Sequence, residues 1–240
     1  MRARSNPRNP LAVLFVTACL LVPVLVSSGY AVPAAFLVLG LVNLRILGGV
    51  LLVRYLKTLA VLSLVSWGLF ILNVLAPAEG TNGLARGAAV FIRSISLISL
   101  SIGFIFVVDP YDLVRALMIR LRLRPRVGYA LFAGWNTIPL LRRDLGIIEN
   151  AQSFRFGKRR RGIRDRVFAA VSLLTGAVRH GERVALSMAA RGAERTEVRT
   201  FIKDSPWTPE DTLYCAAGFL TAGLCSAYFV FAGLFVFSLG

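Results

Sequence analysis

The strongest constraint in this sequence is a set of five long apolar segments. The hydrocarbon core of a bilayer is about 30 Å thick, so a spanning helix needs roughly 20 mostly apolar residues. Five segments meet this requirement, at residues 11–28, 31–53, 58–76, 87–108 and 212–239. The sequence therefore predicts an all-α integral membrane protein with about five transmembrane helices.

Most of the charge lies in one region between the fourth and fifth apolar segments. The chain is 56% hydrophobic, yet it has 28 Lys and Arg against 12 Asp and Glu, a net charge of +16. Residues 115–203 hold 20 of these basic residues and six of the acidic ones, which amounts to +14. The apolar content excludes an intrinsically disordered chain, and three cysteines in 240 residues exclude a secreted disulfide scaffold.

The basic residues also predict the orientation in the membrane, because Lys and Arg concentrate in cytoplasmic loops. Basic residues precede the first apolar segment and separate the second from the third: Arg2, Arg4, Arg8, Arg54 and Lys57. The short loop at 77–83 has Glu79 as its only charged residue. We therefore expect a multi-pass protein of the cell membrane with its N-terminus in the cytoplasm and its C-terminus outside.

This orientation divides the chain into an N-terminal membrane domain of four spans (1–108), a cytoplasmic helical domain (109–211) and a C-terminal transmembrane helix (212–240). The first apolar segment also fits a signal peptide, since a basic stretch precedes it. The next apolar segment follows within a few residues, however, which favours a helical hairpin over a cleavage site.

Two capping signatures delimit the cytoplasmic domain. Asp109-Pro110 and Thr208-Pro209 each combine an N-cap residue with proline at the first helical position, so a helix is expected to begin at each site. Between them the apolar spacing is helical, and its clearest stripe consists of Val167, Val171, Leu174 and Val178. These runs predict amphipathic helices that lie against the membrane, each other or a partner.

The sequence contains little that indicates catalysis. His180 is the only histidine, so no His-rich metal site is expected, and no nucleotide-binding loop is present. We therefore expect no catalytic residues, no bound metal and no cofactor. A basic cluster at 158–166, from Lys158 to Arg166, favours anionic lipid headgroups. Nucleic-acid binding is not expected, because only Phe154 and Phe156 lie near this cluster for stacking on bases.

Two similar segments in the basic region each combine small or apolar residues, an arginine and a glycine. The first occupies residues 151–157 and contains Arg155, and the second occupies residues 185–192 and contains Arg191. Glycine permits the left-handed turn that ends a helix, small residues permit close approach, and Arg offers a forked donor to carboxylates or carbonyls. Each segment fits either an exposed, glycine-capped helix end or a helix end that docks into a groove on another protein.

The order of these features resembles the transmembrane T component of energy-coupling factor (ECF) transporters, the EcfT/CbiQ-like proteins. The resemblance covers nearly the whole chain. It rests on Arg93 in a serine-rich fourth span, the turn at 109–113, the Ala151-Gln152 pair, and the run at 183–186 that leads into Ala190-Arg191-Gly192.

The resemblance implies a non-enzymatic coupling subunit. In such transporters the two motifs cap coupling helices that dock on two cytoplasmic ABC ATPases, a homo- or heterodimer. ATP hydrolysis then moves a small membrane S component, which carries a vitamin or a transition-metal ion. The residues assigned to ATPase coupling are Ala151, Gln152, Arg155, Ala190, Arg191 and Gly192. The first motif departs from the family pattern, because Phe154 and Phe156 flank Arg155 where the family usually has Ala and Gly.

Two other functions remain open from the residues. A membrane-bound lipid-modifying enzyme would need an acid cluster on the cytoplasmic side, and the acids available for it are Asp109, Asp112, Asp144 and Asp211. A conventional ABC permease subunit would form the solute path itself. Substrate specificity is not encoded in any of these residues, since in an ECF transporter it belongs to the S component.

Overall fold

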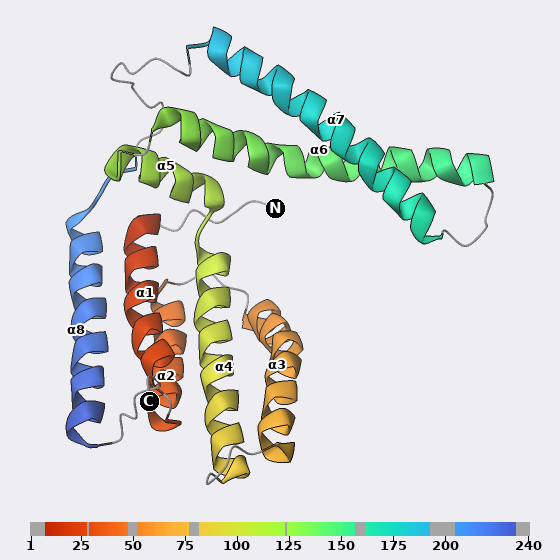
Figure 1. Ribbon diagram of the computed structural model, residues 1–240. Coiled ribbons are helices and arrows are strands. Elements are labelled where there is room, and N and C mark those ends of the chain that lie inside the picture. The colour runs from red at the N-terminus through yellow and green to blue at the C-terminus, as the bar shows by residue number, and fades with distance from the viewer. Residues whose placement is uncertain are drawn as a thin grey trace. The chain divides into compact units, whose positions relative to one another are not determined.

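A computed structural model describes residues 8–27, 29–47, 52–76, 82–122, 124–156, 162–192 and 205–233 (Figure 1). Within these ranges the regular secondary structure is helical, as the apolar periodicity predicts. The helices are α1 (Pro10–Val26), α2 (Ala31–Leu47), α3 (Leu52–Leu75), α4 (Gly83–Val107), α5 (Pro110–Arg120), α6 (Pro125–Phe156), α7 (Ile163–Ala190) and α8 (Pro209–Phe231).

The chain divides into two compact units. The first, here called the membrane unit, consists of Met1–Ala116 and Ser205–Gly240 and contains α1 to α4 and α8. The second, the hairpin unit, consists of Leu117–Asp204 and contains α6 and α7, while α5 begins in the first unit and ends in the second.

Three helices of the membrane unit are long and apolar enough to cross a bilayer, at Val53–Leu75, Gly83–Val107 and Pro209–Phe231. The other two, α1 and α2, are apolar helices of 17 residues each. Seventeen residues rise about 25 Å, slightly less than the thickness of the hydrocarbon core. The part of the chain that the structure describes therefore contains three candidate spans and two shorter apolar helices, where five spans were predicted.

The start of the third segment differs from the expectation. Arg54 and Lys57, expected in a loop, lie in the first two turns of α3 with exposed side chains. Both residue types are good helix formers, and their long stems let the charged heads reach water from a helix that enters the bilayer. The helix thus begins before the apolar segment, and its first turns contain these two charged residues.

An apolar core joins α1, α2, α4 and α8. Its buried residues are Val16, Leu20, Val24, Val32, Phe36, Leu100 and Ala222. Gly218 of α8 lies so close to α1 that a Cβ atom there would be 2.7 Å from the side chain of Val16. Absence of a side chain at this position therefore permits the close packing of the two helices.

Polar side chains link the membrane helices to one another. The hydroxyl groups of Tyr55 and Ser99 lie 2.6 Å apart, and Tyr214 donates a hydrogen bond to Asn43 Oδ1 at 2.6 Å. Arg93 of α4 donates to the carbonyl of Leu25 in the last turn of α1. No water in a bilayer core satisfies such groups, so these contacts provide partners within the protein.

Both predicted caps are confirmed. The backbone N–H of Tyr111 donates to Asp109 Oδ1 at 2.8 Å, and α5 begins at the intervening proline. Thr208 caps α8 through its side chain, and Asp211 three residues later accepts hydrogen bonds from the Thr208 N–H and hydroxyl group. This reciprocal arrangement is a capping box.

The hairpin unit consists of longer helices than the separate apolar runs suggest. Helix α6 has 32 residues and continues through Pro139, and α7 has 28. The two helices contact each other and cross in Figure 1. His180, the only histidine of the sequence, lies well inside α7 with a half-buried side chain.

Candidate functional site

The second arginine motif forms the carboxyl end of α7. Ala190 is the last helical residue, and the N–H of Arg191 donates to the carbonyl of Ser187 at 3.2 Å. Gly192 follows with φ +75°, and its N–H donates to the Ala189 carbonyl at 2.9 Å. The expected left-handed glycine that ends this helix is therefore present, and it leaves Arg191 exposed at the helix end.

The first arginine motif lies in the last turns of α6. Ala151 is exposed there, and the adjacent Phe154 has 89% of its side chain exposed. Arg155 is helical in its backbone, whereas Gly157, the expected end of this motif, lies outside the described residues. Because Phe154 projects into solvent, this helix end presents a bulkier surface than the end of α7.

Gln152 connects the two helices of the hairpin unit. Its Nε2 donates to the backbone carbonyl of Asp165 at 3.2 Å, in the first turn of α7. The carboxylate of Asp165 in turn accepts a hydrogen bond from the Gly162 N–H at 3.1 Å. The carboxyl end of α6 is thus tied to the amino end of α7, which holds the first motif in place within this unit.

Small residues line a groove between α6 and α7 with a volume of about 430 Å³. They are Ala130, Ala133 and Gly134 of α6, and Ala177, Gly181 and Ala185 of α7. Sequence reasoning missed this groove, although the regular four-residue spacing of the three residues on α7 indicates a surface for close helix packing. His180 lies beside the groove. Within the described residues, no group of three or more His, Cys, Asp or Glu could hold a metal ion.

The apolar stripe predicted on α7 faces outward. Val167, Val171, Leu174 and Val178 have between 54% and 65% of their side chains exposed. On α6, Val127, Leu131 and Ile138 are also exposed by more than two fifths. Exposed apolar stripes of this kind are typical of membrane or protein interaction sites.

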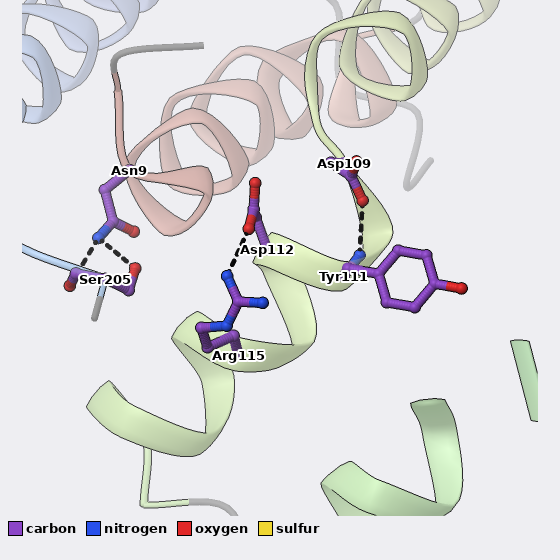
Figure 2. Close-up of polar contacts among 6 residues, drawn as sticks. All are labelled: Asn9, Asp109, Tyr111, Asp112, Arg115 and Ser205. Carbon is purple, nitrogen blue, oxygen red and sulfur yellow. Dashed lines mark hydrogen bonds and ion pairs between the residues drawn. The ribbon is translucent and has the colours of Figure 1, made fainter. Parts of the chain in front are cut away.

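The acids that an enzyme would need have other roles in the structure. Asp211 caps α8. Asp109 caps α5, and Asp112 forms an ion pair with Arg115 at 2.7 Å (Figure 2). Asp211 is also only 1% exposed, so it is not available to a substrate. Three of the four candidate acids are therefore engaged in helix caps or a local ion pair, which disfavours a lipid-modifying enzyme.

The basic cluster at 158–166 is only partly described. Residues 158–161, from Lys158 onward, lie outside the described residues, whereas Arg166 is exposed in the first turn of α7. Other exposed arginines lie further along the hairpin unit, including Arg142, Arg143, Arg179 and Arg183. The exposed surface of this unit thus includes both apolar side chains and positive charge.

The sequence matches the family described as "Cobalt transport protein" (CbiQ) over residues 1–200. No curated protein matches the chain in sequence. The match covers α1 to α7 and both arginine motifs. CbiQ is a family of transport proteins, which agrees with the apolar helices of the membrane unit and identifies the chain as a transport-associated membrane component. The chain belongs to the CbiQ family of cobalt transport proteins.

Proposed function

We propose that this protein is the transmembrane coupling subunit of an ECF-type ABC importer. In this function it links ATP hydrolysis by two cytoplasmic ATPases to the movement of a substrate-binding S component. Membership of a transport family supports the proposal, as does the absence of a nucleotide-binding motif from the sequence. The observation that carries it is the exposed, glycine-terminated helix end at Arg191.

The end of α7 is suited to dock in a groove on an ATPase. The partial negative charge at a helix carboxyl end favours a cation there, and the guanidinium group of Arg191 forms paired hydrogen bonds with a carboxylate. Ala190 and Gly192 add no bulk around it, so the helix end can approach closely. We propose that Arg191 forms a buried ion pair with one ATPase.

The end of α6 is proposed to dock on the second ATPase through Arg155. Gln152 holds this helix end against α7, and Ala151 leaves room beside it. Phe154 is almost fully exposed and makes this surface larger and more apolar. The difference between the two ends favours two non-identical ATPases over a homodimer.

The groove between α6 and α7 and the exposed stripe on α7 are proposed to contact the S component. A helix with small residues on the cytoplasmic side of the S component would fit a groove lined by Ala and Gly, because backbones then approach closely. The family description makes a transition-metal ion such as cobalt the favoured cargo over a vitamin. Anionic headgroups at 158–166 would hold the basic face near the bilayer.

The proposed membrane arrangement keeps five spans, with the two shorter apolar helices, α1 and α2, as two of them. The N-terminus is cytoplasmic, the C-terminus is outside, and residues 109–211 form the cytoplasmic coupling-helix domain between two membrane parts, 1–108 and 212–240. A cysteine introduced at Thr81 should react with an impermeant reagent from outside, and one at Arg160 should react only after permeabilisation. The reverse pattern would contradict this orientation.

Purification with natural partners tests the function. Two ATPases together with a small hydrophobic subunit are expected, whereas ATPases alone would indicate a conventional permease and neither would favour a lipid-modifying enzyme. Arg191→Glu should abolish both ATPase co-purification and ATP-driven uptake. Reversing one charge of a buried pair costs at least the roughly 2 to 5 kcal/mol seen when a partner is truncated.

The matched control is Arg179→Glu, which reverses an exposed arginine in the interior of α7. This variant should retain the ATPases, because its side chain is not at a helix end. Arg155→Glu should act like Arg191→Glu but more weakly. Retention of the full complex and of uptake by Arg191→Glu would overturn the assignment.

A further inference from the structure

A buried carboxylate connects the amino ends of α1 and α8. Asp211 is 1% exposed, and its Oδ1 accepts a hydrogen bond from the backbone N–H of Asn9 at 3.0 Å. Its other oxygen accepts from the N–H and hydroxyl group of Thr208, at 3.0 and 2.9 Å. A single side chain therefore caps α8 and also holds the residue that caps α1, 202 positions away in the sequence.

Asn9 holds the segment that enters α8. Its Nδ2 donates to Ser205 Oγ at 3.1 Å and to the Pro206 carbonyl at 3.2 Å, and Figure 2 shows its amide directed at Ser205. Its Oδ1 accepts from the Leu11 N–H at 3.1 Å and so caps α1. Asn9 is only 4% exposed, so water competes little for these hydrogen bonds.

The same connection continues into the membrane unit. Tyr214, one turn beyond Asp211, donates its hydroxyl proton to Asn43 of α2, and the guanidinium carbon of Arg8 lies 4.3 Å from the centre of its ring. The contacts thus connect the starts of α1 and α8 with the side of α2. All of these residues belong to the membrane unit.

Ser205 is the first residue of the membrane unit after the hairpin unit ends at Asp204. The chain returning from the end of α7 is therefore fixed to α1 at the point where it rejoins the membrane unit. We propose that Asn9, Ser205 and Asp211 form a clasp that transmits displacement of the hairpin unit to α1 and α8 together. The inference rests on the coupling function proposed above.

The physical argument concerns stiffness. A displacement that reaches Ser205 would be absorbed by backbone rotation if this residue were free, whereas its hydrogen bond to buried Asn9 passes the displacement to the helices that the clasp holds. Asn9 contributes the side-chain hydrogen bonds across the clasp, so it is a positioning residue and touches neither cargo nor nucleotide. Its loss is expected to leave ATP hydrolysis intact but to disconnect it from transport.

The test uses the full complex with its ATPases and S component in proteoliposomes, and it measures cargo imported per ATP hydrolysed. Asn9→Ala removes two side-chain hydrogen bonds across the clasp and the cap of α1. It should retain ATPase activity and lower this ratio by about 5- to 30-fold, the factor that corresponds to the two hydrogen bonds lost across the clasp. The control is Asn73→Ala, which removes a hydrogen bond to the Leu69 carbonyl within α3. This control should leave the ratio unchanged. A normal ratio in Asn9→Ala would overturn the proposal.

A cross-link keeps the proposal testable if Asn9→Ala fails to assemble. In a chain whose three cysteines are replaced by alanine, Asn9→Cys combined with Ser205→Cys permits a reducible thiol cross-link across the clasp. The ratio should be low in the reduced state and return toward the wild-type value after cross-linking. A ratio that is the same in both states would contradict transmission through the clasp.

A separate measurement distinguishes failure of the proposed coupling function from failure of the clasp. If the wild-type complex shows no ATP-driven uptake, the proposed function fails, and the clasp is then judged as a structural contact by hydrogen exchange. Amide exchange at Asn9 should accelerate in Asp211→Ala, by about fivefold or more for one lost hydrogen bond. Unchanged exchange there would show that Asp211 does not hold the start of α1.

Discussion

Several apolar residues of α1 are buried against other helices, whereas the apolar stripe of α7 is mostly exposed. The buried residues of α1 are Ala12, Val13, Val16, Thr17, Leu20 and Val24. Three of them, Val16, Leu20 and Val24, belong to the core shared with α2, α4 and α8. In α7 the described residue that is buried is Ala169, and the apolar stripe is more than half exposed. The core formed by α1, α2, α4 and α8 is thus built from internal packing between helices, while the larger apolar side chains of the α7 stripe are exposed.

Because of this difference, different contacts determine which residue types are acceptable in the two units. A residue in the core of the membrane unit is fixed by its neighbours in the same chain. A residue of the α7 stripe is more than half exposed, so partners or lipid determine what it must be. Stability measurements should therefore be sensitive to the first unit, and binding measurements to the second.

The largest difference in the effect of a substitution on stability is expected between two phenylalanines. Phe36 is fully buried in the membrane unit and Phe154 is 89% exposed in the hairpin unit. Phe36→Ala should lower the free energy of unfolding by about 3–5 kcal/mol, because it leaves a cavity. Phe154→Ala should change it by less than about 0.5 kcal/mol.

Unfolding of the purified chain in detergent micelles measures both values, and ATPase co-purification provides the complementary readout. Phe154→Ala should weaken ATPase binding while leaving stability unchanged. Equal losses of stability in the two variants would contradict the division between an internally packed unit and an outward-facing one.

The second contrast compares two glycines. A Cβ atom at Gly218 would lie 2.7 Å from Val16, whereas one at Gly176 would meet no atom within 4 Å. Gly218→Ala should therefore destabilise the chain by about 1–3 kcal/mol through overpacking. Gly176→Ala should stabilise it by up to about 1 kcal/mol, since alanine is the better helix former. Thermal unfolding of the two variants measures these effects, and a stabilising Gly218→Ala would show that α1 and α8 are not closely packed.

Local features of this fold were predictable from the sequence, and long-range ones were not. The caps at Asp109 and Thr208 and the left-handed Gly192 depend on residues within one helical turn, so their spacing is visible in the sequence. The contact between Asn9 and Ser205 joins residues 196 positions apart, and no local pattern indicates it. Arg54 and Lys57 were placed in a loop because hydropathy marks the end of the apolar segment, not the end of hydrogen bonding along the helix.

The candidate site likewise has local features that the sequence predicts and long-range features that it does not. The two arginine motifs were found from composition and spacing, and the structure adds the hydrogen bond by which Gln152 joins α6 to α7. The groove between these helices depends on their crossing, which the sequence does not specify. The spacing of Ala177, Gly181 and Ala185 indicates a packing surface but does not identify the helix that packs there.

The smallest expected effect concerns the end of α7. Gly192 has φ +75°, a conformation that costs an alanine about 1–2 kcal/mol. Gly192→Ala should therefore fray the last turn of α7 and redirect Arg191, which weakens ATPase binding while global unfolding of the membrane unit stays unchanged. Gly146→Ala, an interior position of α6 with open space around it, serves as the control and should retain the ATPases. If Gly192→Ala binds the ATPases as tightly as the control does, the shape of this helix end is not part of the docking surface, and the contrast between the two units would then rest on the apolar stripe alone.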